Sequence, residues 1–173
     1  MYQVGHFING KETKGKSNKK SNIYNPSTGE LIAHVFLANE EEVIDTIKFA
    51  KNSQIKWSKV SIQKRTRIIR KFIDLVYENM DKICILLSKE HGKTLEDSKG
   101  DIQRGLEVAE FCLGSPHLLK GEFSENVSKN IDMFSIKQPI GIAVGVTPFN
   151  FPAMIPMWKF CPAIACGNSF ILK

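Results

Sequence analysis

Residues 140–173 decide the fold, and they read IGIAVGVTPFNFPAMIPMWKFCPAIACGNSFILK. Branched and small residues alternate over Ile140–Val146, which predicts a strand whose small face lets a helix or a ligand approach the backbone closely. Prolines suit the first turn of a helix, so a helix is predicted from Pro152 to about Cys166. A second strand is predicted over Ser169–Lys173. Strand, helix and strand in so short a stretch form a βαβ unit, which predicts a parallel sheet and an α/β fold.

The chain begins with a strand-rich segment. Residues 2–38 alternate apolar runs with turn residues. They predict a strand over Gln3–Ile8 that enters a hairpin at Asn9–Gly10, because Asn-Gly favours the positive φ angles of a two-residue turn. The lysine-rich stretch at 16–20 is interpreted as another hairpin loop, and further strands are expected before residue 38.

Four helices are predicted between residues 39 and 119. Asn39 with Glu42 three residues later forms a capping-box pattern at the start of the first helix. Thr94 can cap the fourth helix, which leads to Gly114 as a C-terminal stop. Apolar residues at helical spacing predict the buried stripe of each helix. In chain order these stripes are Val43, Ile44, Ile47 and Ala50; Ile68, Ile69, Phe72, Ile73 and Val76; Ile83, Leu86 and Leu87; and Ile102, Leu106, Ala109 and Leu113.

The predicted organisation has three parts. A strand-then-helix part covers residues 1–120, a polar hairpin covers 121–139, and the βαβ unit covers 140–173. The chain then stops inside a strand, and a parallel sheet of two strands is not a stable domain. We therefore expect these residues to be the front part of a longer protein.

The composition limits the classes of function. An apolar fraction of 42% fits a folded globular protein. The formal charge of +6 comes from lysines and arginines that are spread along the chain without a nucleic-acid-binding motif, so no nucleic-acid partner is predicted. No apolar run approaches the roughly 18 residues of a membrane helix, and the N-terminus has neither a transit pattern nor a secretory core. These features predict a soluble intracellular protein without a membrane partner.

The chain lacks the common metal and phosphate motifs. There is no GxGxxG, Walker loop or HExxH, and the four cysteines show no CxxC and no cysteine–histidine ligand spacing. No metal site is therefore predicted. Cys84 and Cys112 fall within helical apolar patterns, which predicts buried free thiols. Cys161 and Cys166 lie in or at the end of the helix after Pro152, where core packing is expected.

Two residues are candidates for a site. Asn150 lies between two phenylalanines and two prolines at the carboxyl end of the first predicted parallel strand, where open α/β sheets bind ligands. Its amide can donate to a carbonyl oxygen that becomes negative during a reaction, or it can form a turn by bonding its own backbone. Arg104 shares an apolar helix face with Val108 and Phe111. It holds an anionic ligand group, or it reaches solvent or pairs with an acid such as Asp101.

Several motifs together resemble the aldehyde dehydrogenase superfamily. They are T-P-F-N-F-P, then A-C-G-N-S-F-I-L-K, with F-I-N-G, Y-N-P-S-T-G-E and K-Q-P-I-G-I-A-V-G-V upstream, so the resemblance covers essentially the whole chain. Phe149, where most of the superfamily has tryptophan, and the segment H-G-K-T-L-E-D-S-K-G-D-I-Q-R-G-L-E-V-A-E-F-C are similar to the coenzyme-A-acylating methylmalonate-semialdehyde dehydrogenase subgroup. The resemblance implies an incomplete Rossmann-like NAD-binding domain, made of residues 1–120 and the truncated unit 140–173.

The resemblance also assigns roles to five residues. Asn150 corresponds to the oxyanion-hole donor. Thr147 and Phe149 correspond to residues that line the nicotinamide side of the NAD cleft, and Lys173 to the lysine that reaches the adenosine ribose. Arg104 matches a helix arginine that holds the substrate carboxylate in this subgroup.

The implied activity belongs to a longer enzyme. It is the NAD-dependent oxidation of methylmalonate or malonate semialdehyde, a step of valine catabolism, with coenzyme A as co-substrate and propionyl- or acetyl-coenzyme A as product. The hairpin at 121–139 would mediate contacts in a homodimer or homotetramer. The nucleophilic cysteine and the glutamate of the family lie downstream of the lysine strand, so this chain alone is expected to be inactive. The expected location is the cytoplasm, or the mitochondrial matrix in a eukaryote.

Two alternatives stay open. An NAD- or NADP-dependent aldehyde dehydrogenase that releases a free acid has the same motifs, and dependence on coenzyme A separates it from the acylating enzyme. The other alternative is an inactive truncated chain that only assembles with copies of itself or holds a nucleotide.

Overall fold

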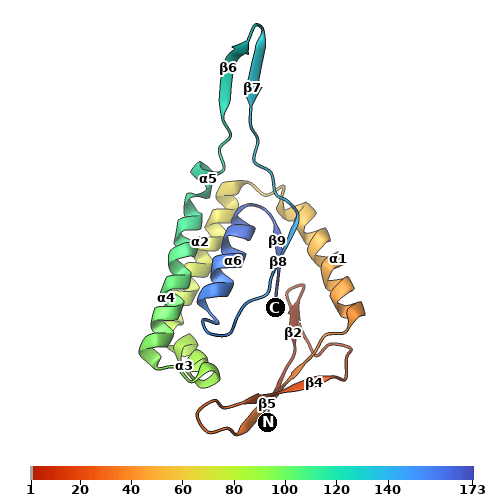
Figure 1. Ribbon diagram of the computed structural model, residues 1–173, viewed down its shortest axis with the longest axis vertical. Coiled ribbons are helices and arrows are strands. Elements are labelled where there is room, and N and C mark those ends of the chain that lie inside the picture. Colours follow the sequence, from red (N-terminus) through yellow and green to blue (C-terminus); the bar gives the residue numbers. More distant parts are fainter. Residues whose placement is uncertain (1) are drawn as a thin grey trace.

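The computed structural model describes residues 2–173, which form a strand-rich base, a helical body and a projecting hairpin (Figure 1). In chain order the elements are β1 (Tyr2–Val4), β2 (His6–Ile8), β3 (Lys11–Thr13), β4 (Lys20–Tyr24), β5 (Leu31–Phe36), α1 (Glu40–Trp57), α2 (Ile62–Glu78), α3 (Met80–His91), α4 (Leu95–Phe111), the 3-10 turn η1 (Cys112–Gly114), α5 (Ser115–Leu118), β6 (Phe123–Ser128), β7 (Ile131–Phe134), β8 (Ile142–Gly145), α6 (Met154–Ala165) and β9 (Ser169–Leu172). None of the helices within residues 2–173 is both long enough and apolar enough to cross a membrane.

The N-terminal strands form two small sheets. In one, β5 pairs in parallel with β1 and antiparallel with β4, and in the other β2 and β3 form a hairpin. The hairpin turn is Asn9–Gly10, with φ angles of 52° and 75°, as the Asn-Gly pattern predicts. The predicted single strand Gln3–Ile8 is instead two strands, because the chain passes between the sheets at Gly5. A Cβ atom at Gly5 would overlap the carbonyl oxygen of Thr13.

The interpretation of residues 16–20 as a hairpin loop is wrong. This stretch leads from β3 to β4, which belong to different sheets. Its position is set by the first turns of α1, because the backbone N–H of Lys16 donates to the Glu42 carboxylate. The Lys16 Nζ also lies 2.9 Å from Glu41 and 3.5 Å from Asp45.

The predicted N-terminal caps of α1 and α4 are present, but the predicted stop at Gly114 is wrong, because α4 ends at Phe111 and Gly114 has a right-handed φ of −74° between η1 and α5. Glu42 donates its backbone N–H to the Asn39 side chain at 2.9 Å, and Asn39 donates its own backbone N–H to the Glu42 carboxylate at 3.0 Å, which completes the capping box. Thr94 Oγ1 accepts the backbone N–H of Asp97 at the start of α4. Helix α3 ends at Gly92, whose φ of 85° is the left-handed conformation that glycine permits at a helix end.

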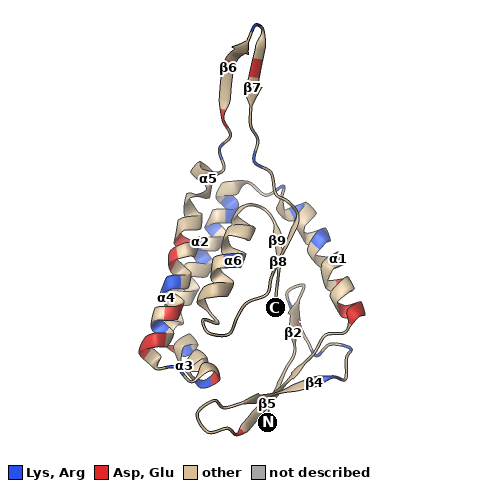
Figure 2. Cartoon of the chain, in the orientation of Figure 1, with Lys and Arg blue, Asp and Glu red and all other residues tan. Residues whose placement is uncertain are grey.

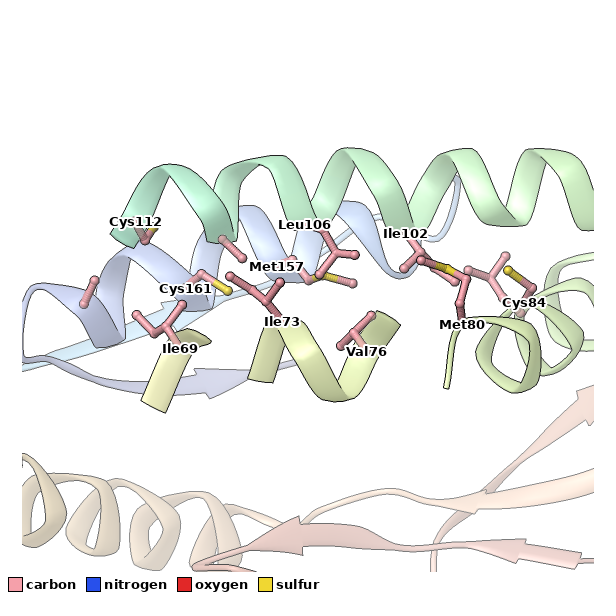
Figure 3. Close-up of a cluster of buried hydrophobic side chains, with 13 residues drawn as sticks. Ile69, Ile73, Val76, Met80, Cys84, Ile102, Leu106, Cys112, Met157 and Cys161 are labelled. Atoms are coloured by element: carbon pink, nitrogen blue, oxygen red, sulfur yellow. The ribbon is translucent and has the colours of Figure 1, made fainter. Parts of the chain in front are cut away.

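The core lies between α2, α3, α4 and α6 (Figure 3). The predicted stripes of α2 and α4 supply much of it, and methionines and cysteines fill the rest. All four cysteines are free, and the prediction of buried thiols is confirmed for Cys84 and Cys112. Core packing is confirmed for Cys161 but not for Cys166, which is only half-buried at the end of α6. The buried members are Ile69, Ile73, Val76, Met80, Cys84, Leu87, Ile102, Leu106, Ala109, Cys112, Met157, Cys161 and Ala165.

The predicted buried stripe of α1 is wrong. Val43, Ile44 and Ile47 are 48%, 45% and 43% exposed. Helix α1 packs against β8 and β9, and a sheet of two strands is too small to cover its apolar face. Ile68 of α2 and Leu86 of α3 are likewise exposed, because they lie on the sides of their helices that face away from the core.

The βαβ unit is confirmed. Strands β8 and β9 pair in parallel, with Ile142 opposite Ser169 and Gly145 opposite Leu172, and α6 connects them. Helix α6 packs along α4, which places the loop between β8 and α6 beside the α3–α4 junction. Strands β6 and β7 form the predicted antiparallel hairpin, which is exposed along its whole length and extends away from the helical body (Figure 1).

Candidate functional site

The two parallel strands end at the same edge, and Thr147 and Lys173 meet there. The backbone N–H of Thr147 donates to the carbonyl oxygen of Lys173 at 3.0 Å, and the Thr147 hydroxyl lies 3.4 Å from the same oxygen. The Lys173 side chain is exposed and forms no ion pair with any residue of the described chain. This edge is where open α/β sheets bind ligands, so a hydroxyl and a free ammonium group are available in a suitable place.

The small-residue face of β8 is filled from within the chain. Gly145 is buried, and a Cβ atom there would lie 3.1 Å from Cε1 of the Phe170 ring and 3.2 Å from Cδ of Lys159. Contacts this short leave no room for a side chain. The sequence predicts that a helix or a ligand approaches this face. In the structure, Lys159 of α6 and Phe170 of β9 occupy the space beside Gly145.

Phe149 lies against the end of α3. Its ring centroid is 5.5 Å from that of His91, with the ring planes inclined by 37°. The residue nevertheless remains 59% exposed, so much of its surface is available for contact with another group. The aromatic contact fixes one side of the loop to α3 while the other side of the ring faces solvent.

Asn150 has a free carboxamide. The residue is exposed, and its side chain makes no hydrogen bond with any group between residues 2 and 173. The alternative in which Asn150 bonds its own backbone is therefore not what the structure contains. Its main-chain carbonyl, in contrast, accepts a hydrogen bond from Lys93 Nζ at 3.2 Å. The backbone of Asn150 is held while its amide group is left available for a ligand.

A buried ion pair behind the loop was not predicted from the sequence. Lys93 Nζ lies 2.8 Å from Asp101 Oδ2, with the two side chains 10% and 0% exposed. Asp101 Oδ1 also accepts the backbone N–H of Met154 at 2.7 Å, at the start of α6. Negative charge at a helix N-terminus is favourable, because the unpaired N–H groups there carry partial positive charge.

The sequence held a signal for this pair. Asp101 follows Ser98 and precedes Gly105 at helical spacing, so small residues flank it on one face of α4. Small residues on a helix face let a neighbouring helix approach closely, and an acid between them will be buried by that neighbour. A buried acid needs a partner, which Lys93 supplies from the residues just before the helix.

Arg104 is exposed and lies apart from this pair. Its predicted alternative partner, Asp101, is instead bonded to Lys93, and no ion pair involving Arg104 is formed among the residues described. The main-chain carbonyl of Arg104 accepts a hydrogen bond from Trp158 Nε1 at 3.0 Å, which fixes this part of α4 to α6. The guanidinium is thus free to meet an anionic group.

Three of the four cysteines, Cys84, Cys112 and Cys161, are poor nucleophiles because they are buried. Burial raises the pKa of Cys161 to about 12 and that of Cys112 to about 11, and burial also raises the pKa of Cys84. A thiol with so high a pKa stays protonated at neutral pH, and only the thiolate attacks carbonyl carbons.

No group of three or more His, Cys, Asp or Glu side chains that could hold a metal ion occurs within residues 2–173. Basic and acidic residues are dispersed, with both signs on α4 (Figure 2).

Comparison with known proteins identifies the family. The sequence profile described as the aldehyde dehydrogenase family matches residues 13–173. The chain therefore belongs to the aldehyde dehydrogenase family, as the sequence motifs indicate.

Its relatives include semialdehyde dehydrogenases. A Dictyostelium discoideum protein assigned as an acylating, mitochondrial methylmalonate-semialdehyde/malonate-semialdehyde dehydrogenase is 47% identical over 96% of this chain and 32% of its own length. A malonate-semialdehyde dehydrogenase of Pseudomonas aeruginosa is 45% identical over the whole chain and 35% of its own length. A Sinorhizobium meliloti structure, assigned as a methylmalonate-semialdehyde dehydrogenase in complex with NAD, is 54% identical, with a TM-score of 0.97 over 99% of this chain and 35% of that chain. This chain thus spans about a third of the length of the relatives it matches.

Proposed function

We propose that this chain supplies the oxyanion donor and part of the NAD site of a coenzyme-A-acylating methylmalonate/malonate-semialdehyde dehydrogenase. The observation that carries the proposal is the free carboxamide of Asn150, presented at the carboxyl end of β8 on a backbone held by Lys93. The high identity to the Sinorhizobium meliloti protein, whose structure contains NAD, supports the choice of cofactor.

Asn150 would act on the aldehyde oxygen. When a thiolate attacks the aldehyde carbon, the carbonyl oxygen gains negative charge, and the Asn150 amide N–H would donate a hydrogen bond to it. One such donor in a preorganised site contributes about 3 kcal/mol to stabilisation of the transition state. The thiolate would come from the cysteine that the family resemblance places downstream of Lys173, and burial raises the pKa of Cys84, Cys112 and Cys161 in this chain.

The NAD site would use the edge formed by β8 and β9. The exposed ammonium of Lys173 fits the hydroxyl groups of the adenosine ribose, and Thr147 and the exposed Phe149 would line the nicotinamide side of the cleft. When bound, NAD accepts the hydride that leaves the substrate. The residues of this chain would bind and orient the cofactor and would not react with it.

The test of the oxyanion role is Asn150→Ala in the full-length enzyme that contains this chain. The acylation rate measured by stopped flow should fall by about 10²–10³-fold, while NAD affinity should change little, because in this proposal the carboxamide would contact the substrate oxygen and not NAD. Asn52→Ala is the matched control, since Asn52 is an exposed asparagine on α1 away from the loop. Survival of the acylation rate within a few-fold would refute the oxyanion role.

Arg104 would hold the substrate carboxylate. We expect Arg104→Gln to raise KM for malonate semialdehyde by about 10-fold or more and to leave KM for an uncharged aldehyde nearly unchanged, because only the former loses a charge-assisted hydrogen bond. Equal effects on both substrates would show that Arg104 acts on the fold and does not bind the carboxylate.

The acylating reaction differs from hydrolysis in its second substrate. Thioester product should form only when coenzyme A is present, whereas release of the free acid without coenzyme A would favour the hydrolytic alternative.

The hairpin β6–β7 would bind another subunit, because Phe123, Met133 and Phe134 are 66%, 59% and 67% exposed. Replacing Phe134 by Ser should reduce the oligomer size seen by light scattering, and an unchanged size would exclude this role.

A further inference from the structure

Asp101 is a buried acid with two different partners. Its side chain is fully buried, and its two oxygens are used separately: Oδ2 pairs with Lys93 and Oδ1 accepts the backbone N–H of Met154. Both contacts lead toward the same loop, because Met154 follows it and begins α6. A buried carboxylate without partners is strongly destabilising. Asp101 therefore needs both of these contacts at its buried position.

Lys93 contacts the loop directly. Besides Asp101, its Nζ donates to the carbonyl oxygen of Asn150 at 3.2 Å and lies 4.7 Å from the centre of the Phe151 ring. The ammonium therefore has an anion, a carbonyl dipole and an aromatic face around it. Lys93 thus contacts two consecutive loop residues, Asn150 and Phe151.

The base of Lys93 is itself fixed. It lies between Gly92, which ends α3 with a φ of 85°, and Thr94, which caps α4. Its carbonyl oxygen accepts a hydrogen bond from Ser88 Oγ at 2.7 Å. The backbone of Lys93 is thus fixed at the junction of α3 and α4 by contacts that do not involve the loop.

We propose that Lys93 and Asp101 are positioning residues for the oxyanion donor, holding the backbone of residues 150–154 so that the Asn150 carboxamide has one orientation. The inference rests on the function proposed above, and it assigns neither residue a contact with substrate. Residues 147–153 contain no helix or strand, so contacts with the helical body have to determine where the loop lies. Lys93 holds its middle and Asp101 its end.

The expected effect is on rate and not on binding. A displacement of about 1 Å of a catalytic group can lower the rate by about 10²-fold. The residues proposed for NAD binding have other anchors, because Thr147 bonds to Lys173 and Phe149 packs on His91. We therefore expect loss of the pair to lower the acylation rate with little change in NAD affinity. A residue that only supports overall folding would not lower the acylation rate while leaving NAD affinity unchanged.

The experiment is a double-mutant cycle in the full-length enzyme. The combined change Lys93→Met and Asp101→Asn removes both charges, so no unpaired buried charge remains, and Asn can still accept the Met154 N–H. This variant is made with Asn150 present and again with Asn150→Ala. With Asn150 present, the acylation rate should fall by about 10–100-fold. In the Asn150→Ala background, the same change should alter the rate by less than about twofold, because the group being positioned is already absent.

Two further variants keep the test decisive. Lys93→Arg keeps a charge for Asp101 and so preserves folding, but it moves the donor away from the Asn150 carbonyl. Its rate should fall by about threefold to tenfold only when Asn150 is present, and this variant carries the test if the neutral pair does not fold. Lys89→Met is the matched control, because Lys89 is an exposed lysine in the last turn of α3. Its rate should be unchanged.

The outcomes separate the two proposals. An equal fold-loss with and without Asn150, or a rate within about twofold when Asn150 is present, overturns the positioning role and leaves the oxyanion role standing. If Asn150→Ala alone has no effect, the oxyanion role fails first and the positioning role with it.

Discussion

Two glycines of α4 give a quantitative test of how α4 and α6 pack. A Cβ atom at Gly105 would lie 2.8 Å from Met157 Sδ and 3.2 Å from Met154 Cα, whereas at Gly100 it would meet nothing within 4 Å. Both glycines lie within the same helix. The same change to alanine therefore differs between the two positions only in the space available.

The magnitudes follow from this difference. Replacing glycine by alanine within a helix stabilises by roughly 1 kcal/mol, because glycine loses more backbone freedom on folding. Gly100→Ala should therefore raise the free energy of unfolding by about 0.4–1 kcal/mol. Gly105→Ala gains the same term but overpacks the contact with α6, at a cost of about 1–3 kcal/mol. The Met157 sulfur can move, but the backbone of Met154 cannot move without displacing the start of α6.

The assay is urea unfolding followed by far-UV circular dichroism. Gly105→Ala should be about 1–3 kcal/mol less stable than Gly100→Ala, and this difference isolates the packing cost. Gly105→Ala should also lower the acylation rate of the full-length enzyme, because Met154 ends the loop that carries Asn150. If the two variants are equally stable within about 0.5 kcal/mol, α4 and α6 are not packed as closely as described.

Two other predictions concern titrating groups. Hydrogen bonds from the backbone of Asn39 and of Lys16 lower the pKa of Glu42 below its ordinary value of 4.5, so this carboxylate stabilises the fold above about pH 4.5 and the contribution is lost as the pH falls through its folded-state pKa. The stability difference between the wild type and Glu42→Gln should therefore be full at pH 7 and should disappear in acid. Alkylation by iodoacetamide at pH 8 should reach Cys166, which is half-buried, long before Cys161, which is buried and has a raised pKa.

Each of these has a clear contrary result. A difference between the wild type and Glu42→Gln that stays constant from pH 7 to pH 3 would mean that the carboxylate is not held by the cap. Equal alkylation of Cys161 and Cys166, measured by mass spectrometry of their peptides under native conditions, would mean that α6 opens or packs loosely. Complete alkylation of both in urea is the control for reactivity.

The sequence by itself determined the features that depend on neighbours along the chain. Asn39 and Glu42 are three residues apart, so their spacing alone predicts the capping box. The Asn9–Gly10 turn and the βαβ unit are likewise local patterns of turn residues and of alternation. The family could be identified from the sequence because its motifs are also local, as contiguous stretches such as T-P-F-N-F-P.

Only the tertiary structure decided which faces are covered and what holds the loop. The stripe of α1 has the spacing of a buried face, yet it is exposed because the small sheet beside α1 does not reach it. Asp101 and Met154 are 53 positions apart, and Lys93 reaches Asn150 across 57. Hydrogen bonds over such separations form only when α4 and α6 pack together, and that packing depends on the absence of a side chain at Gly105. Spacing along a chain encodes a cap or a turn, but contacts between distant helices follow from the shapes of the surfaces that meet.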